Sequence, residues 1–180
     1  GVGEAVRQAV MLDAALWKKI VKLAPAYRDR DGAALAELVR EVCASRAKKG
    51  TTSFALWAAA RLESMSGYKL PHGYSVSIGL CIDLGYAVAR GLMKKADLDR
   101  VVKLLDECGA LDGLAHSGHL LGQADGLLSG LDAWTLTTGT KALTMPCAIG
   151  KSQEEDEPDR EVFKAVLERV KAQKIATGAQ

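Results

Sequence analysis

SGYKLPHGYSVSIGLCIDLGYAVARGLM, residues 66–93, contains the longest apolar run of the chain and decides how the fold is built. After Pro71, nearly every side chain is apolar or small, so the sequence predicts a helix over residues 72–89 that is buried on all sides. Residues 76–92 contain Asp83 and Arg90 and are few for a membrane span, which favours a core helix.

The composition is typical of a globular protein with balanced charge. Of the 180 residues, 48% are hydrophobic and 26% are charged, which is enough apolar surface for a core and argues against disorder. The 24 basic residues are interleaved with 22 acidic ones, and the net charge is +2. This balance argues against nucleic acid and against a membrane as partners.

The cysteines and the start of the chain bear on its origin. Cys43, Cys81, Cys108 and Cys147 form no C-x-x-C pair and are interpreted as reduced thiols of a cytoplasmic protein, although their spacing leaves disulfides open. No signal-peptide pattern is present. The chain begins Gly1-Val2-Gly3 without a methionine, which suggests an excised domain.

Most of the remaining sequence predicts helices, separated where glycine and proline fall. The expected helices cover residues 4–23, 31–48, 53–65, 72–89, 96–108 and 159–173. Residues 111–139 are rich in glycine and serine and are expected to be irregular, with one short helix, and residues 141–146 have strand character. The predicted fold is therefore all-α: one helical domain over residues 1–180, an orthogonal multi-helix bundle with at most a small β-hairpin near residues 134–150.

Three collinear blocks point to a family. They are GVGEAVRQAVMLDAALW (residues 1–17), SFALWAAARLESMSGYKLPHGYSVSIGLCIDLGYAVARGLM (53–93) and LTMPCAIGKSQEEDEPDREVF (143–163). Together they resemble the C-terminal helical domain of dehydroquinate synthase and related sugar-phosphate cyclases. That resemblance implies NAD- and metal-dependent lyases in which a separate N-terminal domain holds NAD. Because no G-x-G-x-x-G follows a strand here, NAD is not expected to bind this chain.

The resemblance implies a metal site that is only partly present. It places metal ligands at Glu4, at His72 of the family's H-G-E motif, and at Leu56, where the family has a histidine. A catalytic zinc needs about three protein ligands and an open position, and leucine cannot coordinate a metal. We therefore expect no cofactor, and at most a residual Glu4/His72 site that zinc occupies weakly. Taken alone, Glu4 would be a solvated acid in a first helical turn and His72 an ordinary histidine at a helix start.

Other positions of the family's site are also substituted, and no catalytic residue is predicted. Arg7 and Arg46 stand where the resemblance implies lysines, and Ala60 stands where it implies a proton-transfer histidine. Tyr74 replaces the glutamate of the H-G-E motif. Tyrosine, tryptophan and arginine are typical of binding surfaces. The candidate residues for contacts with a substrate or partner are Arg7, Arg46, Leu56, Trp57, Ala60, Arg61 and Tyr74.

These substitutions remove charge and metal coordination where function would be, and leave core-type positions intact. The first hypothesis is a non-catalytic binding module, engineered or repurposed, for a protein or small-molecule ligand. One alternative is an excised or inactivated C-terminal domain of an NAD- and metal-dependent cyclase. Another is a divergent protein that keeps the Glu4/His72 metal site. A dimer is expected through the face that the missing domain would leave exposed.

Overall fold

The computed structural model describes residues 1–173 of the chain. Within these residues helices dominate and the strands form one antiparallel pair, so the mostly helical fold class is confirmed. The elements in chain order are α1 (Val2–Leu12), α2 (Ala14–Arg28), α3 (Gly32–Lys49), α4 (Leu56–Met65), α5 (His72–Ala89), α6 (Lys95–Glu107), the 3-10 turn η1 (Leu114–His116), α7 (Gly118–Leu121), α8 (Ala124–Thr138), β1 (Leu143–Ala148), β2 (Lys151–Glu155) and α9 (Arg160–Lys171).

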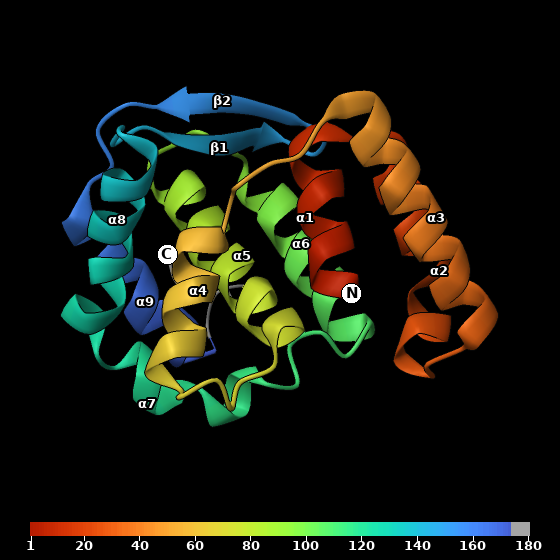
Figure 1. The fold of residues 1–180 in the computed structure, drawn as a ribbon, viewed down its shortest axis with the longest axis horizontal. Helices are drawn as coiled ribbons and strands as arrows, with labels where there is room; N and C mark the ends of the chain where they lie inside the picture. Colours follow the sequence, from red (N-terminus) through yellow and green to blue (C-terminus); the bar gives the residue numbers. More distant parts are fainter. Residues whose placement is uncertain (174–180) are drawn as a thin grey trace.

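Helix α5 is the centre of the molecule, as its apolar sequence predicts. Every residue from 75 to 87 is buried, and α5 packs against α1, α4, α6, α9 and β1 (Figure 1). Near its C-terminal end Tyr86 stacks on Phe163 of α9, with the ring centroids 4.0 Å apart. Trp57 of α4 meets the same phenylalanine edge-on at 5.3 Å. Helix α9 is thus joined through aromatic contacts to α4 and α5, which lie much earlier in the chain.

The first predicted helix is two helices. Asp13 leaves the helical conformation, with φ −144° and ψ 86°, and its Oδ1 accepts the N–H groups of Ala15 and Leu16 at 3.0 and 3.1 Å. It therefore begins α2 as an N-cap. The helix also runs past its predicted end at residue 23: Pro25 lies in the last turn, where it removes one helical hydrogen bond without ending the helix. By contrast, α3 lies close to its predicted range of residues 31–48, with Asp31 as its N-cap and Gly50 as its C-cap.

The segment 111–139, predicted to be irregular, contains η1, α7 and the 15-residue helix α8. The prediction was wrong because tertiary packing outweighs the low helix propensity of glycine. A side-chain carbon at Gly130 would lie only 3.0 Å from the carbonyl oxygen of Trp57, so glycine is what lets α8 approach α4. Leu127, Leu128 and Leu131 are buried beside it.

The β-hairpin lies slightly later in the chain than predicted. Residues 134–138 belong to α8, whereas β2 extends past residue 150 into the acidic run of residues 154–157. Glu155 is the reason that run is partly ordered: its Oε1 accepts hydrogen bonds from the Tyr86 hydroxyl at 2.9 Å and from Arg90 Nε at 3.0 Å. The hairpin therefore crosses one end of the helices (Figure 1).

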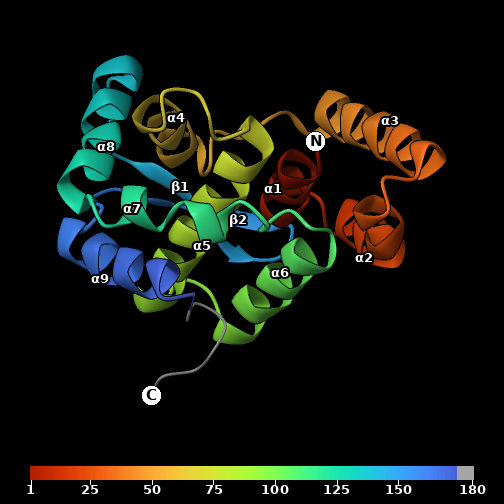
Figure 2. The ribbon, with the colours of Figure 1, turned by 90° about the horizontal axis from the view of Figure 1, so that it is seen from below.

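Helices α2 and α3 form the outer layer on one side of the molecule, with α8 and α9 on the other (Figure 2). The four cysteines are free thiols, and burial raises the pKa of Cys81 to about 12 and that of Cys108 to about 11. Among the described residues, no helix is both long enough and apolar enough to cross a bilayer.

Candidate functional site

The candidate site forms where α1 and α5 begin. Gly3 makes this close crossing feasible, because a side-chain carbon there would lie 2.8 Å from the carbonyl oxygen of Gly73. The next residue, Glu4, is thereby placed beside His72, with Glu4 Oε1 and His72 Nε2 3.3 Å apart. The other ring nitrogen, Nδ1, lies 2.6 Å from Oε1 of Glu63 on α4. The imidazole therefore sits between two carboxylates.

The second oxygen of Glu4 is held by two arginines. Its Oε2 accepts hydrogen bonds from Nη2 of Arg7 and from Nη2 of Arg46, each at 2.7 Å. Arg7 is 4% exposed and also donates to the carbonyl oxygen of Thr52. Burial alone would raise the pKa of Glu4, but the hydrogen bond from Arg7 and the charges of Arg7, Arg46 and His72 lower it below its ordinary value.

An open groove of about 630 Å³ lies over this cluster. We call it the α3 groove. Its lining combines apolar side chains with the charged residues Glu4, Arg7, Arg46 and His72. The apolar part comes mainly from α3 and includes Leu35, Leu38, Val39 and Val42, joined by Leu56 from α4. The site therefore has a charged part and an apolar part.

The donor set does not fit a catalytic metal. Both oxygens of Glu4 face cationic or imidazole nitrogens, and Arg7 and Arg46 bring two positive charges to the carboxylate that a cation would need. Leu56 lines the groove where a third ligand is implied, and it has no donor atom. Within residues 1–173 no group of three or more histidine, cysteine, aspartate or glutamate side chains is arranged to hold a metal. Glu4 and His72 are adjacent, as the resemblance implies, but they pair with each other.

Four of the predicted contact residues do not line the α3 groove. Trp57 is 4% exposed and its indole N–H donates to Asp83 Oδ1 at 3.0 Å, which makes it a core residue. Arg61 donates from Nε to the carbonyl oxygen of Gly126 at 2.8 Å and joins α4 to α8. Tyr74 packs against Gly113 on a different face, and Ala60 is exposed outside the groove. Arg7, Arg46 and Leu56 are the contact candidates that converge.

Two residues matter more than the sequence indicated. Glu63 binds His72, and its place on the same predicted helix as Leu56 and Ala60 was the available signal. Asp83 is 1% exposed in the middle of α5, and its Oδ2 accepts the N–H of Ala55 at 2.9 Å. Burial raises the pKa of Asp83 to about 7, against the lowering effect of its hydrogen bonds from Ala55 and Trp57. A lone acid in an apolar helix was the signal for a buried partner.

Comparison with known proteins supports the resemblance. Residues 54–116 match the family model described as the C-terminal part of 3-dehydroquinate synthase. The chain is 24% identical over 121 residues to a 3-dehydroquinate synthase of Pelotomaculum thermopropionicum, a match that covers 61% of this chain and 33% of that protein.

Among solved structures, the chain matches ValA, a 2-epi-5-epi-valiolone synthase from Streptomyces hygroscopicus subsp. jinggangensis 5008 with NAD+ and Zn2+ bound. The TM-score is 0.77 and the sequence identity is 19%. The match covers 96% of this chain and 50% of that one, and it shows a shared fold. The chain thus spans about a third of the curated relative and half of the solved structure.

Proposed function

We propose that this chain is one domain of a larger protein and that its site binds an anion without a metal. The premise is that the chain is built like the C-terminal helical domain of dehydroquinate synthase and related sugar-phosphate cyclases. The family match over residues 54–116 and the shared fold support the first part. The curated relative and the solved structure both extend well beyond the length of this chain, which supports the proposal that a second domain accompanies it.

The observation that carries the second part is the pairing of Glu4. In the cyclase resemblance this glutamate is a metal ligand, whereas here Arg7 and Arg46 supply the positive charge beside it. One carboxylate and two guanidinium groups leave this trio with a charge of +1. The Nε–H groups of Arg7 and Arg46 also lack a protein acceptor in the described chain. Arginine is the side chain best suited to bind a carboxylate or phosphate.

The same site lacks the groups for metal-dependent turnover. Ala60 has nothing to titrate where the resemblance implies a proton-transfer histidine, and general acid–base catalysis needs a titratable group. Leu56 adds apolar surface where a ligand is implied. We therefore propose that the site binds and does not catalyse the family's reaction, with the oxyanion of the ligand at Arg46 and its apolar part along α3.

Metal content of protein purified without chelator or affinity tag, measured by mass spectrometry, tests the proposal. Zinc far below one ion per chain is expected in both wild type and His72→Ala. Stoichiometric zinc in the wild type that is lost in His72→Ala would overturn the proposal and revive the Glu4/His72 metal site. The variant Leu56→His serves as the positive control because it places a histidine in the groove at the ligand position that the resemblance implies.

A second candidate function is a stand-alone binding module, which the open apolar face of α3 favours. Val39 is 61% exposed there, and large exposed apolar patches mark binding surfaces. Titration with the separately produced N-terminal domain of the Pelotomaculum synthase distinguishes the two candidates. A domain of a cyclase-like protein should recognise it, whereas an independent or engineered module should not. Sedimentation of the chain alone reports whether the same face forms a dimer.

A further inference from the structure

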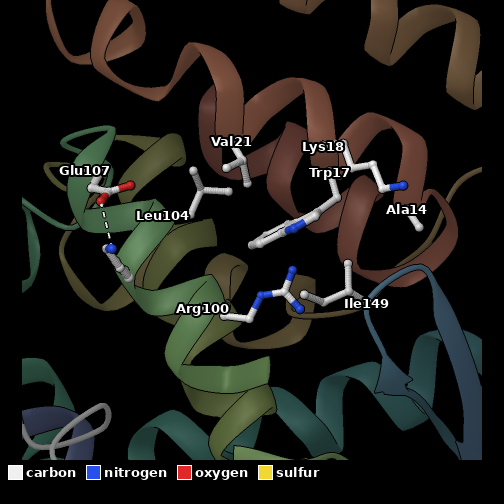
Figure 3. Close-up of a pocket in the computed structure, with 9 residues that line it drawn as sticks. Ala14, Trp17, Lys18, Val21, Arg100, Leu104, Glu107 and Ile149 are labelled. Atoms are coloured by element: carbon white, nitrogen blue, oxygen red, sulfur yellow. Dashed lines mark ion pairs between the residues drawn. The ribbon is translucent and has the colours of Figure 1, made fainter. Parts of the chain in front are cut away.

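A second groove lies between α2 and α6, and the proposed function does not use it. It encloses about 520 Å³, within the range of small-molecule sites, and Trp17 and Val21 of α2 face Leu104 of α6 across it (Figure 3). The lining of this Trp17 groove shares no residue with that of the α3 groove. It is therefore a separate place for a ligand.

The hairpin fixes one end of the Trp17 groove. Gly150, with φ +82°, donates its N–H to the carbonyl oxygen of Val10 at 2.7 Å, and a side-chain carbon there would lie 2.6 Å from the nitrogen of Ala14. Glycine thus lets the hairpin turn dock on the junction of α1 and α2. The neighbouring Ile149 is held at the groove, where Figure 3 shows it beside Trp17 and Arg100. The groove is accordingly built from three mutually fixed elements.

The polar groups of the Trp17 groove are nearly all donors. Its charged lining is Lys18, Arg100 and Lys103 against the single acid Glu107, a net charge of +2. Glu107 pairs with Lys103 at 3.6 Å, and Lys18 has no ion-pair partner in the described chain. Arg100 bonds Asp97 through Nη1 at 3.1 Å, and its guanidinium lies 5.7 Å from the centre of the Trp17 ring. An acceptor with negative charge would complement this lining.

The apolar surface indicates what must accompany that charge. Val21 is 45% exposed, whereas Leu104 and Trp17 are 2% and 4% exposed and form the closed part of the groove. We infer that the Trp17 groove binds a small aromatic anion, an aryl carboxylate or aryl phosphate, with the ring against Val21 and Trp17 and the oxyanion between Lys18 and Arg100. Arginine on an aromatic face beside a lysine favours a planar ligand with one anionic end.

The test uses 1-naphthoate as the probe and the neutral 1-naphthalenemethanol as its matched control, followed by 15N–1H spectra of the tryptophan indoles. Trp17→Phe assigns the Trp17 resonance, and Trp57, bonded to Asp83, reports that the fold is intact. Naphthoate should shift the Trp17 resonance saturably. The variant Lys18→Gln/Arg100→Gln should bind at least about tenfold more weakly, which is about 1.4 kcal/mol. Arg160→Gln, a similarly exposed arginine on α9, should bind as the wild type does.

Three outcomes would overturn the inference. Equal affinity for naphthoate and the neutral alcohol would show that the cations play no part. Unchanged affinity in Lys18→Gln/Arg100→Gln, with the Trp57 resonance intact, would show that the anion lies elsewhere. A shift of the backbone amide resonances of Val39 and Val42, without a shift of the Trp17 indole resonance, would place the probe in the α3 groove. That result would leave the proposed function unaffected.

Discussion

Two carboxylates in this molecule show how differently a negative charge can be accommodated. Glu4 stands at the edge of a groove with two arginines and a histidine, and its pKa is lowered. Asp83 lies inside the core with two neutral N–H donors and no cation, and its pKa is raised to about 7. The pKa is shifted more at Asp83, whose role is structural, than at Glu4. A shifted pKa therefore marks burial first, and function only where a groove and converging charges accompany it.

Removing Asp83 is expected to produce the largest effect in this comparison. Asp83→Ala leaves the N–H groups of Ala55 and Trp57 buried without an acceptor, at about 1–3 kcal/mol each, so a loss of about 4 kcal/mol in unfolding free energy is expected. Urea denaturation at pH 7 measures it. Asp83→Asn retains one acceptor oxygen and should lose about half as much. A loss below about 1 kcal/mol for the alanine variant would show that water replaces the carboxylate.

Removing Glu4 is expected to cost less, because its partners keep other contacts. Glu4→Ala leaves Arg7 buried with only the Thr52 carbonyl oxygen as an acceptor, and breaking such a pair costs up to about 3–5 kcal/mol when both groups are fully buried. Since Glu4 is 20% exposed, a loss of about 2 kcal/mol is expected from urea denaturation. Glu4→Gln keeps an acceptor oxygen, so its unfolding free energy should lie between those of the wild type and Glu4→Ala. Equal stability of all three would contradict a structural role for the pair.

The pH dependence of stability should separate the two carboxylates. Because the folded pKa of Asp83 is raised, the native state holds a proton that the unfolded state has released between about pH 4 and 7. Stability should therefore fall as pH rises through this window, by at most about 1.4 kcal/mol per pH unit. The lowered pKa of Glu4 acts in the opposite sense, and its contribution is lost as pH falls below about 4.5. Urea denaturation of the wild type and of Asp83→Asn at pH values from 4 to 8 tests this. If the unfolding free energy changed with pH in the same way in both proteins, the raised pKa would be contradicted.

The smallest effect is expected at Arg46. Its side chain is 37% exposed, and Glu4 keeps its bond to Arg7 when Arg46 is replaced. Arg46→Ala should therefore lower the unfolding free energy by about 0.5 to 1 kcal/mol, and the loss should shrink in high salt. Lys19→Ala, which breaks the exposed pair with Glu41, is the matched control. A loss above about 2 kcal/mol would show that Arg46 is as firmly held as Arg7.

Sequence reasoning found the elements whose causes are local. The apolar run of α5 and the helix starts near residues 31 and 159 were predictable because each depends on residues that are neighbours in the chain. Helix α8 was not, because Gly130 serves a contact with Trp57, about 70 residues earlier in the chain. Periodicity also could not tell that Trp57 faces Asp83 instead of the groove. The meeting of Glu4 with His72 came only from the family resemblance.

The docking of the hairpin on α1 also orders events during synthesis. Helix α1 is made before most of the elements that it contacts: its partners include α5, α6 and both strands, and the Gly150 N–H reaches back to Val10. At roughly 5–20 residues per second, the ribosome needs about 7 to 28 seconds to make the intervening chain. During that interval the apolar face of α1, with Val6 and Met11, has no native cover. Final closure of this helical bundle must therefore wait until the hairpin has left the ribosome, and a chaperone encountering the chain earlier would meet α1 exposed.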